Sequence, residues 1–221
     1  WSANGTWYAL TRANAATLYG AQWGYKGALP VPGDYDGDGI GDQAVYDLKT
    51  MKWYIRSTGT QGALAFGLLW GQLGATPVTG DYDGDGSADP AFYNPNSGRW
   101  YAWSLTKSAV VNGTQWGYKG ALPKPGDYDG DGIADLAIYD PQNGNWFVRS
   151  TASSTVLIWG QNWGFAGALA IPGDYNGDGS ADLAVYSRFS GKWYIRSVAG
   201  DVLAFGRQWG YAGAEPVSGD F

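Results

Sequence analysis

Four short acidic loops carry the residues in this chain that are best suited to chemistry. The loops span residues 34–42, 81–89, 127–135 and 174–182, and each has acidic or amide side chains at positions 1, 3, 5 and 9, with Gly at positions 4 and 6. Residues two apart in a tight turn can direct oxygen atoms at one centre, which is the arrangement that binds a hard cation. The pattern therefore predicts about four Ca²⁺ sites.

The loops belong to a repeat of 46 or 47 residues, and Gly219-Asp220-Phe221 begins a fifth copy. A small apolar run such as Ala44-Val45-Tyr46 follows each loop, then a polar turn, then an aromatic segment such as 53–56. Short β-branched and aromatic runs separated by Gly and Asn predict strands joined by tight turns. No segment has a sustained period of 3.6 residues, so we expect almost no helix.

Four strands in a repeat of this length are typical of a β-propeller blade, with a solenoid as the alternative. A Trp-Gly pair ends the last segment of each copy at five positions: Trp23, Trp70, Trp116, Trp163 and Trp209. We therefore predict an all-β fold, a five-bladed β-propeller of four-stranded blades with Ca-binding hairpin loops, as a single domain over residues 1–221. The closing blade would combine residues 7–10 and 18–23 with an inner strand from 216–221.

The fifth copy lacks most of its loop. Either the natural chain is longer, or the closing blade lacks one strand.

The run Pro-Val-Pro-Gly-Asp-Tyr-Asp-Gly-Asp-Gly at residues 30–39, followed by Asp42 and the Ala-Val-Tyr strand, resembles the FG-GAP/VCBS repeats of bacterial surface and secreted proteins. The same unit builds the head propeller of integrin α-subunits and some fungal propeller lectins. The resemblance covers essentially the whole chain. It implies a loop in the hairpin between the first two strands of each blade, where side chains at positions 1, 3, 5 and 9 and the carbonyl at position 7 bind Ca²⁺.

The ligands that this resemblance implies are one set of five per loop. They are Asp34, Asp36, Asp38, Ile40 and Asp42; Asp81, Asp83, Asp85, Ser87 and Asp89; Asp127, Asp129, Asp131, Ile133 and Asp135; and Asp174, Asn176, Asp178, Ser180 and Asp182. Because affinity follows the number of ligand charges, Asn176 predicts that the fourth site is the weakest.

An EF-hand shares part of the loop pattern but requires a bidentate Glu at position 12 and flanking helices. Position 12 is apolar in every copy, and lies within a predicted strand. The residues are Val45, Phe92, Ile138 and Val185. The EF-hand interpretation is excluded.

Composition excludes several classes of function. The chain has no Cys and no His, which rules out disulfides, Cys or His zinc sites and His-based acid–base catalysis. Of its 20 acidic residues only Asp47, Asp140, Asp201, Glu215 and Asp220 lie outside the four loops. They are scattered, so we predict that the chain is not an enzyme. No basic cluster indicates nucleic-acid binding, and no apolar run is long enough to insert into a membrane.

The net charge of −6 mainly reflects the loops, since four divalent ions would change it to +2. Loops with three or four carboxylates suit the millimolar calcium outside cells. We therefore expect a secreted or cell-surface protein, bacterial by its resemblance, with this chain as a monomeric module of a larger protein.

Aromatic and basic residues at the Trp-Gly corners are candidates for ligand binding, because they fall on connections between blades. The candidates are Trp23, Tyr25, Lys26, Trp116, Tyr118, Lys119, Trp163, Trp209 and Tyr211. Aromatic faces suit the C–H faces of sugar rings, whereas the competing interpretation is packing of the repeated Trp residues between blades. We predict a calcium-stabilised, non-catalytic module that binds carbohydrate. The alternative is an adhesion scaffold that contacts a surface protein.

Overall fold

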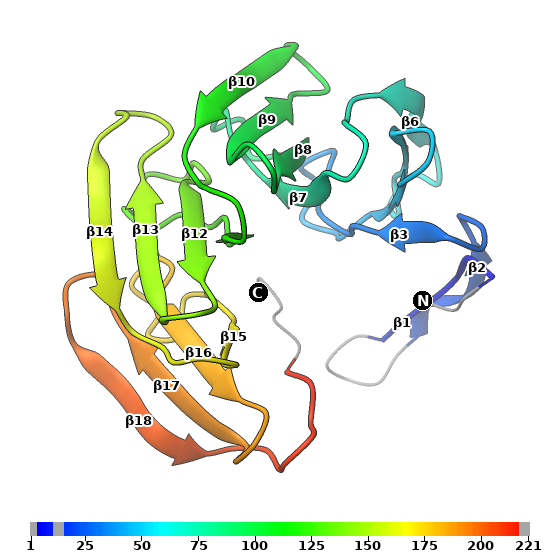
Figure 1. The fold of residues 1–221 in the computed structure, drawn as a ribbon. Helices are drawn as coiled ribbons and strands as arrows, with labels where there is room; N and C mark the ends of the chain where they lie inside the picture. Colours follow the sequence, from blue (N-terminus) through cyan, green and yellow to red (C-terminus); the bar gives the residue numbers. More distant parts are fainter. Residues whose placement is uncertain (1–3, 11–15, 217–221) are drawn as a thin grey trace. The chain divides into compact units, whose positions relative to one another are not determined.

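The computed structural model describes residues 4–10 and 16–216, which form eighteen β-strands and no helix. The strands make one two-stranded sheet and four four-stranded antiparallel sheets, each in chain order (Figure 1). This confirms the predicted all-β class. Because the described residues contain no helix, none of their segments is a helix able to span a membrane.

Each sheet is a meander of consecutive strands. The two-stranded sheet contains β1 (Thr6–Leu10) and β2 (Ala16–Gln22). The next two sheets contain β3 (Ala28–Pro30), β4 (Gln43–Asp47), β5 (Lys52–Arg56) and β6 (Ala63–Leu69), and then β7 (Thr76–Gly80), β8 (Asp89–Asn94), β9 (Arg99–Trp103) and β10 (Ala109–Gln115). The last two contain β11 (Leu122–Pro123), β12 (Leu136–Asp140), β13 (Asn145–Arg149) and β14 (Val156–Asn162), and then β15 (Leu169–Ala170), β16 (Leu183–Ser187), β17 (Lys192–Arg196) and β18 (Val202–Gln208).

The acidic loops join the first two strands of each four-stranded sheet, where the resemblance to FG-GAP repeats implied they would be. In the first of these sheets β3 pairs with β4 in the register Leu29↔Tyr46, and a bridge between Gly33 and Asp42 closes the loop. Equivalent bridges close the third and fourth loops. The loops are thus the turns of tight hairpins.

The third and fourth strands of the sheets pair with a break in register that a glycine makes possible. In β6 the break lies opposite Trp53/Tyr54, and Gly67 has a φ of 78°. Gly160 in β14 and Gly206 in β18 have φ values of 69° and 66°. Glycine adopts this left-handed conformation without the steric cost that other residues incur, so each outer strand carries a glycine bulge.

The chain divides into two compact units, each with its own apolar core. The first comprises residues up to 81 with 85–94 and 101–112, and the second comprises 82–84, 95–100 and residues from 113 onward. Alternation along β5 buries Trp53 and Ile55 in the first unit, and alternation along β13 buries Trp146 and Val148 in the second. The indole N–H of Trp53 donates to the Trp70 carbonyl at 2.7 Å, so its polar atom is satisfied.

The predicted closing blade is described only in part. The segments predicted at 7–10 and 18–23 pair as the hairpin β1–β2. The inner strand predicted from 216–221 falls almost entirely on residues 217–221, which lie outside the described residues. Closure and the single domain over 1–221 stay predictions.

Two glycines in the second unit allow a test of backbone packing. Gly144 and Gly160 both have positive φ, but only a Cβ at Gly144 would overlap backbone atoms, those of Gly164 and Phe165. We expect Gly160→Ala to lower the free energy of unfolding by about 1 kcal/mol, the cost of left-handed backbone. Gly144→Ala should cost a further ~1–3 kcal/mol because of overpacking. Urea denaturation of both variants in calcium tests this, and equal losses would contradict it.

Candidate metal loops and aromatic grooves

The first Asp of each loop holds the turn together through its own carboxylate. Asp34 Oδ1 accepts the N–H of Gly37 at 2.8 Å, and its Oδ2 accepts the N–H of Gly39 at 2.7 Å. Asp127 makes the same two bonds to Gly130 and Gly132. The two loop glycines have positive φ, which lets successive N–H groups converge on one side chain.

The Asp at position 9 ties the loop to the end of the third strand. Asp42 is 2% exposed; its Oδ2 accepts the N–H of Tyr35 at 2.9 Å, and its Oδ1 accepts the N–H of Thr58 at 2.8 Å. Asp135 is bonded in the same way by Tyr128 and Thr151.

Burial raises the pKa of Asp42, and it raises the pKa of Asp135 to about 7 although both backbone donors oppose this. No Lys or Arg among the described residues pairs with either carboxylate. A cation in the loop would supply the missing positive charge.

Three loops bring carboxylate oxygens within 4.8 Å of one another. The sets are Asp34, Asp36 and Asp42; Asp81, Asp83 and Asp85; and Asp127, Asp129 and Asp135. Each set could hold a metal ion, and donors that are all oxygen fit a hard cation such as Ca²⁺. The other predicted acidic ligands of these loops are Asp38, Asp89 and Asp131. Of these, Asp38 and Asp131 accept the N–H groups of Ile40 and Ile133, two of the predicted carbonyl ligands.

The fourth loop forms no such carboxylate set. The amide of its Asn176 donates a hydrogen bond to Asp178 Oδ2 at 2.8 Å. A neutral amide thus contacts a carboxylate oxygen that would otherwise be available to bind a cation. Asp174 keeps the turn bonds, to Gly177 at 2.6 Å and Gly179 at 3.0 Å. The fold of this loop therefore persists where its charge is reduced.

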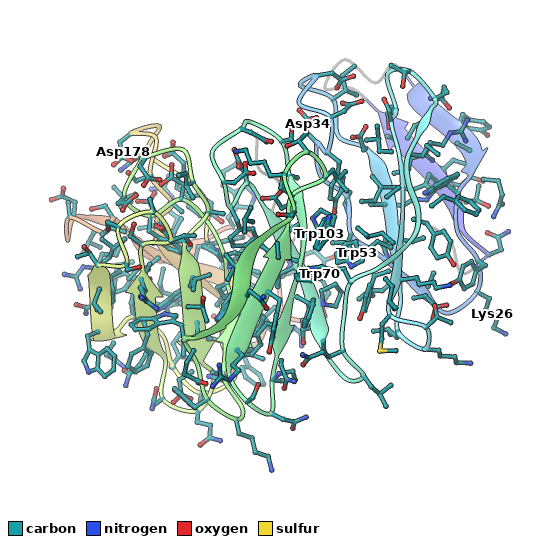
Figure 2. All side chains as sticks on the ribbon, turned by 90° about the horizontal axis from the view of Figure 1, so that it is seen from above. Lys26, Asp34, Trp53, Trp70, Trp103 and Asp178 are labelled. Carbon is teal, nitrogen blue, oxygen red and sulfur yellow. The ribbon has the colours of Figure 1, made fainter. Side chains whose placement is uncertain are left out.

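Consecutive loops are joined by a backbone hydrogen bond. The N–H of Ala88, at position 8 of the second loop, donates to the carbonyl of Asp34 at 2.6 Å. Ala181 in the fourth loop donates to the carbonyl of Asp127 at 2.5 Å. In the first unit Asp34 lies at one end of the sheets, and Lys26 lies toward the opposite end (Figure 2).

The first unit also has a groove lined by aromatic residues, the first aromatic groove. Its cavity of about 260 Å³ is lined by Trp23, Tyr25, Tyr54 and Phe66 with Val45. Tyr54 and Phe66 meet edge to face at 5.3 Å, and the indole N–H of Trp23 donates to the Tyr54 carbonyl at 3.1 Å. Phe66 is nevertheless 78% exposed.

The second unit repeats the construction as the second aromatic groove. A cavity of about 370 Å³ is lined by Trp116, Tyr118, Phe147 and Trp159, with Ile138 and Gln115. Phe147 and Trp159 meet edge to face at 5.5 Å, and Trp159 is 74% exposed. The indole N–H of Trp116 donates to the Phe147 carbonyl at 3.3 Å.

The last residue of the second strand fixes the tyrosine at the rim of each groove. The hydroxyl of Tyr25 donates to Asp47 at 2.5 Å, and that of Tyr118 donates to Asp140 at 2.8 Å. Burial would raise the pKa of Asp47, but bonds from Tyr25, Thr50 and the N–H of Lys49 outweigh it and hold this pKa well below the ordinary range. These two carboxylates, scattered in sequence, therefore have structural partners.

The sequence-based ligand candidates divide into two groups. Trp23, Tyr25, Trp116 and Tyr118 line the two grooves. The remaining five line neither groove. Lys26, Lys119 and Tyr211 are exposed. The ring of Trp163 packs against that of Phe205, with 6.1 Å between centroids, and Trp209 lines a separate apolar hollow.

Sequence reasoning missed Tyr54, Phe66, Phe147 and Trp159. The sequence did contain a signal for Phe66 and Trp159, because an aromatic residue precedes a glycine at the same place in four copies of the repeat. The pairs are Tyr19-Gly20, Phe66-Gly67, Trp159-Gly160 and Phe205-Gly206.

Comparisons with known proteins show the fold but no family. No family model matches the chain, and no curated protein matches it. A solved structure described as a streptogramin B lyase matches 91% of this chain and 61% of its own, with a TM-score of 0.57 and 13% identity. The virginiamycin B lyase of Staphylococcus aureus matches 91% of this chain and 62% of its own, with a TM-score of 0.56 and 13% identity.

The chain spans about three fifths of the length of these two lyases. The biofilm matrix protein Bap1 of V. cholerae matches 87% of this chain and 30% of its own at 18% identity, but a TM-score of 0.41 is too low to support a shared fold. The likeness to the lyases, with the four-stranded sheets, shows a β-propeller-like fold. The FG-GAP/VCBS resemblance stays a prediction.

The lyases contradict the prediction that the chain is not an enzyme. That prediction treated a repeat-built propeller without His or paired acids as unsuited to catalysis, whereas two proteins with this fold are described as lyases. The prediction is wrong on that ground. Lyase activity is a property of those proteins, because a likeness at 13% identity shows the fold alone.

The bond between Tyr25 and Asp47 predicts a pH effect. Because the folded pKa of Asp47 lies below its unfolded value, the group stabilises the fold above about pH 4, and this stabilisation is lost as pH falls through the folded pKa. Tyr25→Phe should raise the pKa of Asp47 and reduce stability at pH 7, and this loss should shrink as the pH falls toward the folded pKa of the natural chain. NMR titration and urea denaturation measure both, with Lys26→Ala as the neighbouring control. An unchanged Asp47 pKa in Tyr25→Phe would contradict this account.

Proposed function

We propose that this chain is a calcium-stabilised recognition module whose aromatic grooves bind carbohydrate, as part of a secreted or cell-surface protein. The observation that supports this most directly is the repetition of one groove design in both units. In each, one exposed aromatic ring meets a half-buried one edge to face, beside a Trp and a Tyr from a Trp-Gly corner.

Sugar rings fit the chemistry of these grooves. The face of an aromatic ring is electron-rich and attracts the polarised C–H groups on the apolar face of a pyranose. Tyr25 with Asp47, and Tyr118 with Asp140, add fixed polar groups at the rim that can bond sugar hydroxyls. Two similar sites on one chain would gain strength through avidity on a multivalent glycan.

Exposure of the rings also favours a ligand. Phe66 and Trp159 leave most of their surface in water, although burial of a large aromatic side chain is favourable by roughly 1.5–3 kcal/mol. Each ring stands beside other aromatic residues, and such contiguous apolar surface marks binding sites more often than single exposed residues do.

Calcium has a structural part in this proposal. The ion would lie among the loop carboxylates, balance the buried charge at position 9, and add its binding free energy to that of folding. Millimolar affinity of such loops would suit the calcium concentration outside cells. The five-bladed ring formed by the whole chain belongs to the same proposal, and five Trp-Gly corners support it.

One observation favours the alternative role of a protein-binding scaffold. An apolar hollow of about 370 Å³ on the last sheet is lined by Tyr175, Trp193, Leu203 and Trp209, and Trp209 is 79% exposed. A partner protein with an apolar contact surface would fit this hollow.

A glycan array in millimolar calcium, repeated with chelator, tests the proposal. We expect binding in calcium, reduced at least ~10-fold by Phe66→Ala or Trp159→Ala, since stacking on an aromatic ring contributes about 1–3 kcal/mol in comparable sites. Phe189→Ala is the matched control, because Phe189 is 79% exposed and lines neither groove. Failure of the folded protein to bind any glycan would favour the scaffold instead.

Thermal unfolding tests the metal loops. Saturation of one site at about 100 times its Kd adds about 2.7 kcal/mol, so calcium should raise the Tm and chelator should lower it. Asp129→Asn should reduce this increase, whereas Asp201→Asn removes the same charge outside the loops and should not. Isothermal titration of Asn176→Asp should show a tighter fourth site. A calcium-independent Tm would disprove the metal role.

A further inference from the structure

Three sheets end their third strand in an arginine that the following turn holds in place. The Nε groups of Arg56, Arg149 and Arg196 donate to the carbonyls of Gln61, Ser154 and Gly200 at 3.1, 3.2 and 3.3 Å. All three accepting residues have positive φ, at 61°, 63° and 110°. A left-handed turn residue thus directs its carbonyl at the inner edge of each guanidinium.

Two of these guanidinium groups also lie over a tryptophan ring. The Cζ atom of Arg196 is 5.9 Å from the ring centroid of Trp163, and that of Arg56 is 5.7 Å from the centroid of Trp23. A cation over an aromatic face is attracted by the ring quadrupole, which limits the motion of the side chain. Arg149 has no such ring contact within the part of the chain that the structure describes.

The outer edge of the Arg196 guanidinium has no protein acceptor among the described residues. Its hydrogen bond to Gly200 uses Nε, and no carboxylate of those residues pairs with it. The planar fork of Nη donors matches the two oxygens of a carboxylate. Because the side chain is already held on two sides, binding an anion would cost little further ordering.

A cavity is lined in part by Arg196. It has a volume of about 190 Å³ and is lined by Arg196 and Ser197 at the end of β17, by Gln161 and Leu157 of β14, and by Leu183 of β16. This is smaller than the 300–1,000 Å³ that is typical of drug-sized ligand sites. It suits the acidic substituent and part of one ring of a larger molecule whose remainder lies outside.

We propose that the Arg196 cavity binds the carboxylate of an acidic sugar residue, and that glycans containing uronic acids are the preferred ligands. This inference rests on the proposed carbohydrate-binding function and names its substrate class. The guanidinium bonds the carboxylate through both Nη atoms, while the Gln161 amide and the Ser197 hydroxyl bond neighbouring oxygens.

The test uses an array of uronic-acid oligosaccharides, each paired with its methyl-esterified form, which keeps the ring and removes the charge. In millimolar calcium we expect the acidic forms to bind at least ~10-fold more tightly, the gain of one strong charge-assisted contact. Arg196→Gln should abolish this preference. Arg196→Lys, which keeps the charge without the fork, should retain only part of it.

Arg149→Gln is the matched control, because it removes the same charge and the same turn bond from a residue without a Trp contact. It should keep the preference, and thermal unfolding in calcium verifies that each variant folds. Equal binding of acids and esters by the natural chain would overturn the inference and leave the proposed function standing. An equal effect of Arg149→Gln, or tighter binding of sulfated glycans, would also overturn it. Absence of binding to every glycan would remove both proposals.

Discussion

The buried aspartate at the ninth position of each loop is the constraint on which the rest of the structure depends. In Asp42 one carboxylate joins the start of the loop, through Tyr35, to the turn after the third strand, through Thr58. It therefore fixes three strands of the sheet relative to one another. The same group is a buried charge, which is unfavourable unless a proton or a cation neutralises it. The hairpin geometry and the demand for a cation thus arise from one side chain.

The strand that follows this aspartate links the loop to the groove. β4 is buried along its whole length, begins next to Asp42 and ends at Asp47, which fixes Tyr25. β12 has the same design with Asp140 and Tyr118. In the other two sheets the second strand ends in a different residue. β8 ends at Asn94, whose amide donates to the side chain of the corner residue Gln72. β16 ends at Ser187, and the corner residue there is Phe165, which has no hydroxyl to donate. The last residue of the second strand thus differs with the corner residue that it contacts. In the two sheets with a groove, this strand end positions the tyrosine at the groove rim.

The sequence allowed the all-β class, the hairpin loops and the Trp residues of the corners to be predicted, because each follows from local pattern repeated in register. The groove floor could not be predicted in this way. Phe66 and Trp159 are exposed on outer strands, and only the left-handed glycine after each brings the ring onto the neighbouring aromatic of the third strand. Lys26 and Lys119 are of a residue type that suits a sugar site and lie beside corner aromatics in sequence, but they line neither groove. The prediction that the chain is not an enzyme was wrong: it rested on the scatter of the acidic residues outside the loops, whereas proteins with this fold are described as lyases.

The bulge glycines have a consequence for how the sheets behave toward other chains. Every four-stranded sheet ends in an outer strand whose free backbone groups are a template for pairing, and an aromatic ring on that strand adds to the tendency to aggregate. A glycine with positive φ interrupts the straight edge in each case. Gly113 keeps this conformation in β10, with a φ of 74°, although Asn112 replaces the aromatic residue there. The glycine therefore has a role beyond placing a ring, because a bulge makes each outer edge a poorer template for pairing with a foreign strand.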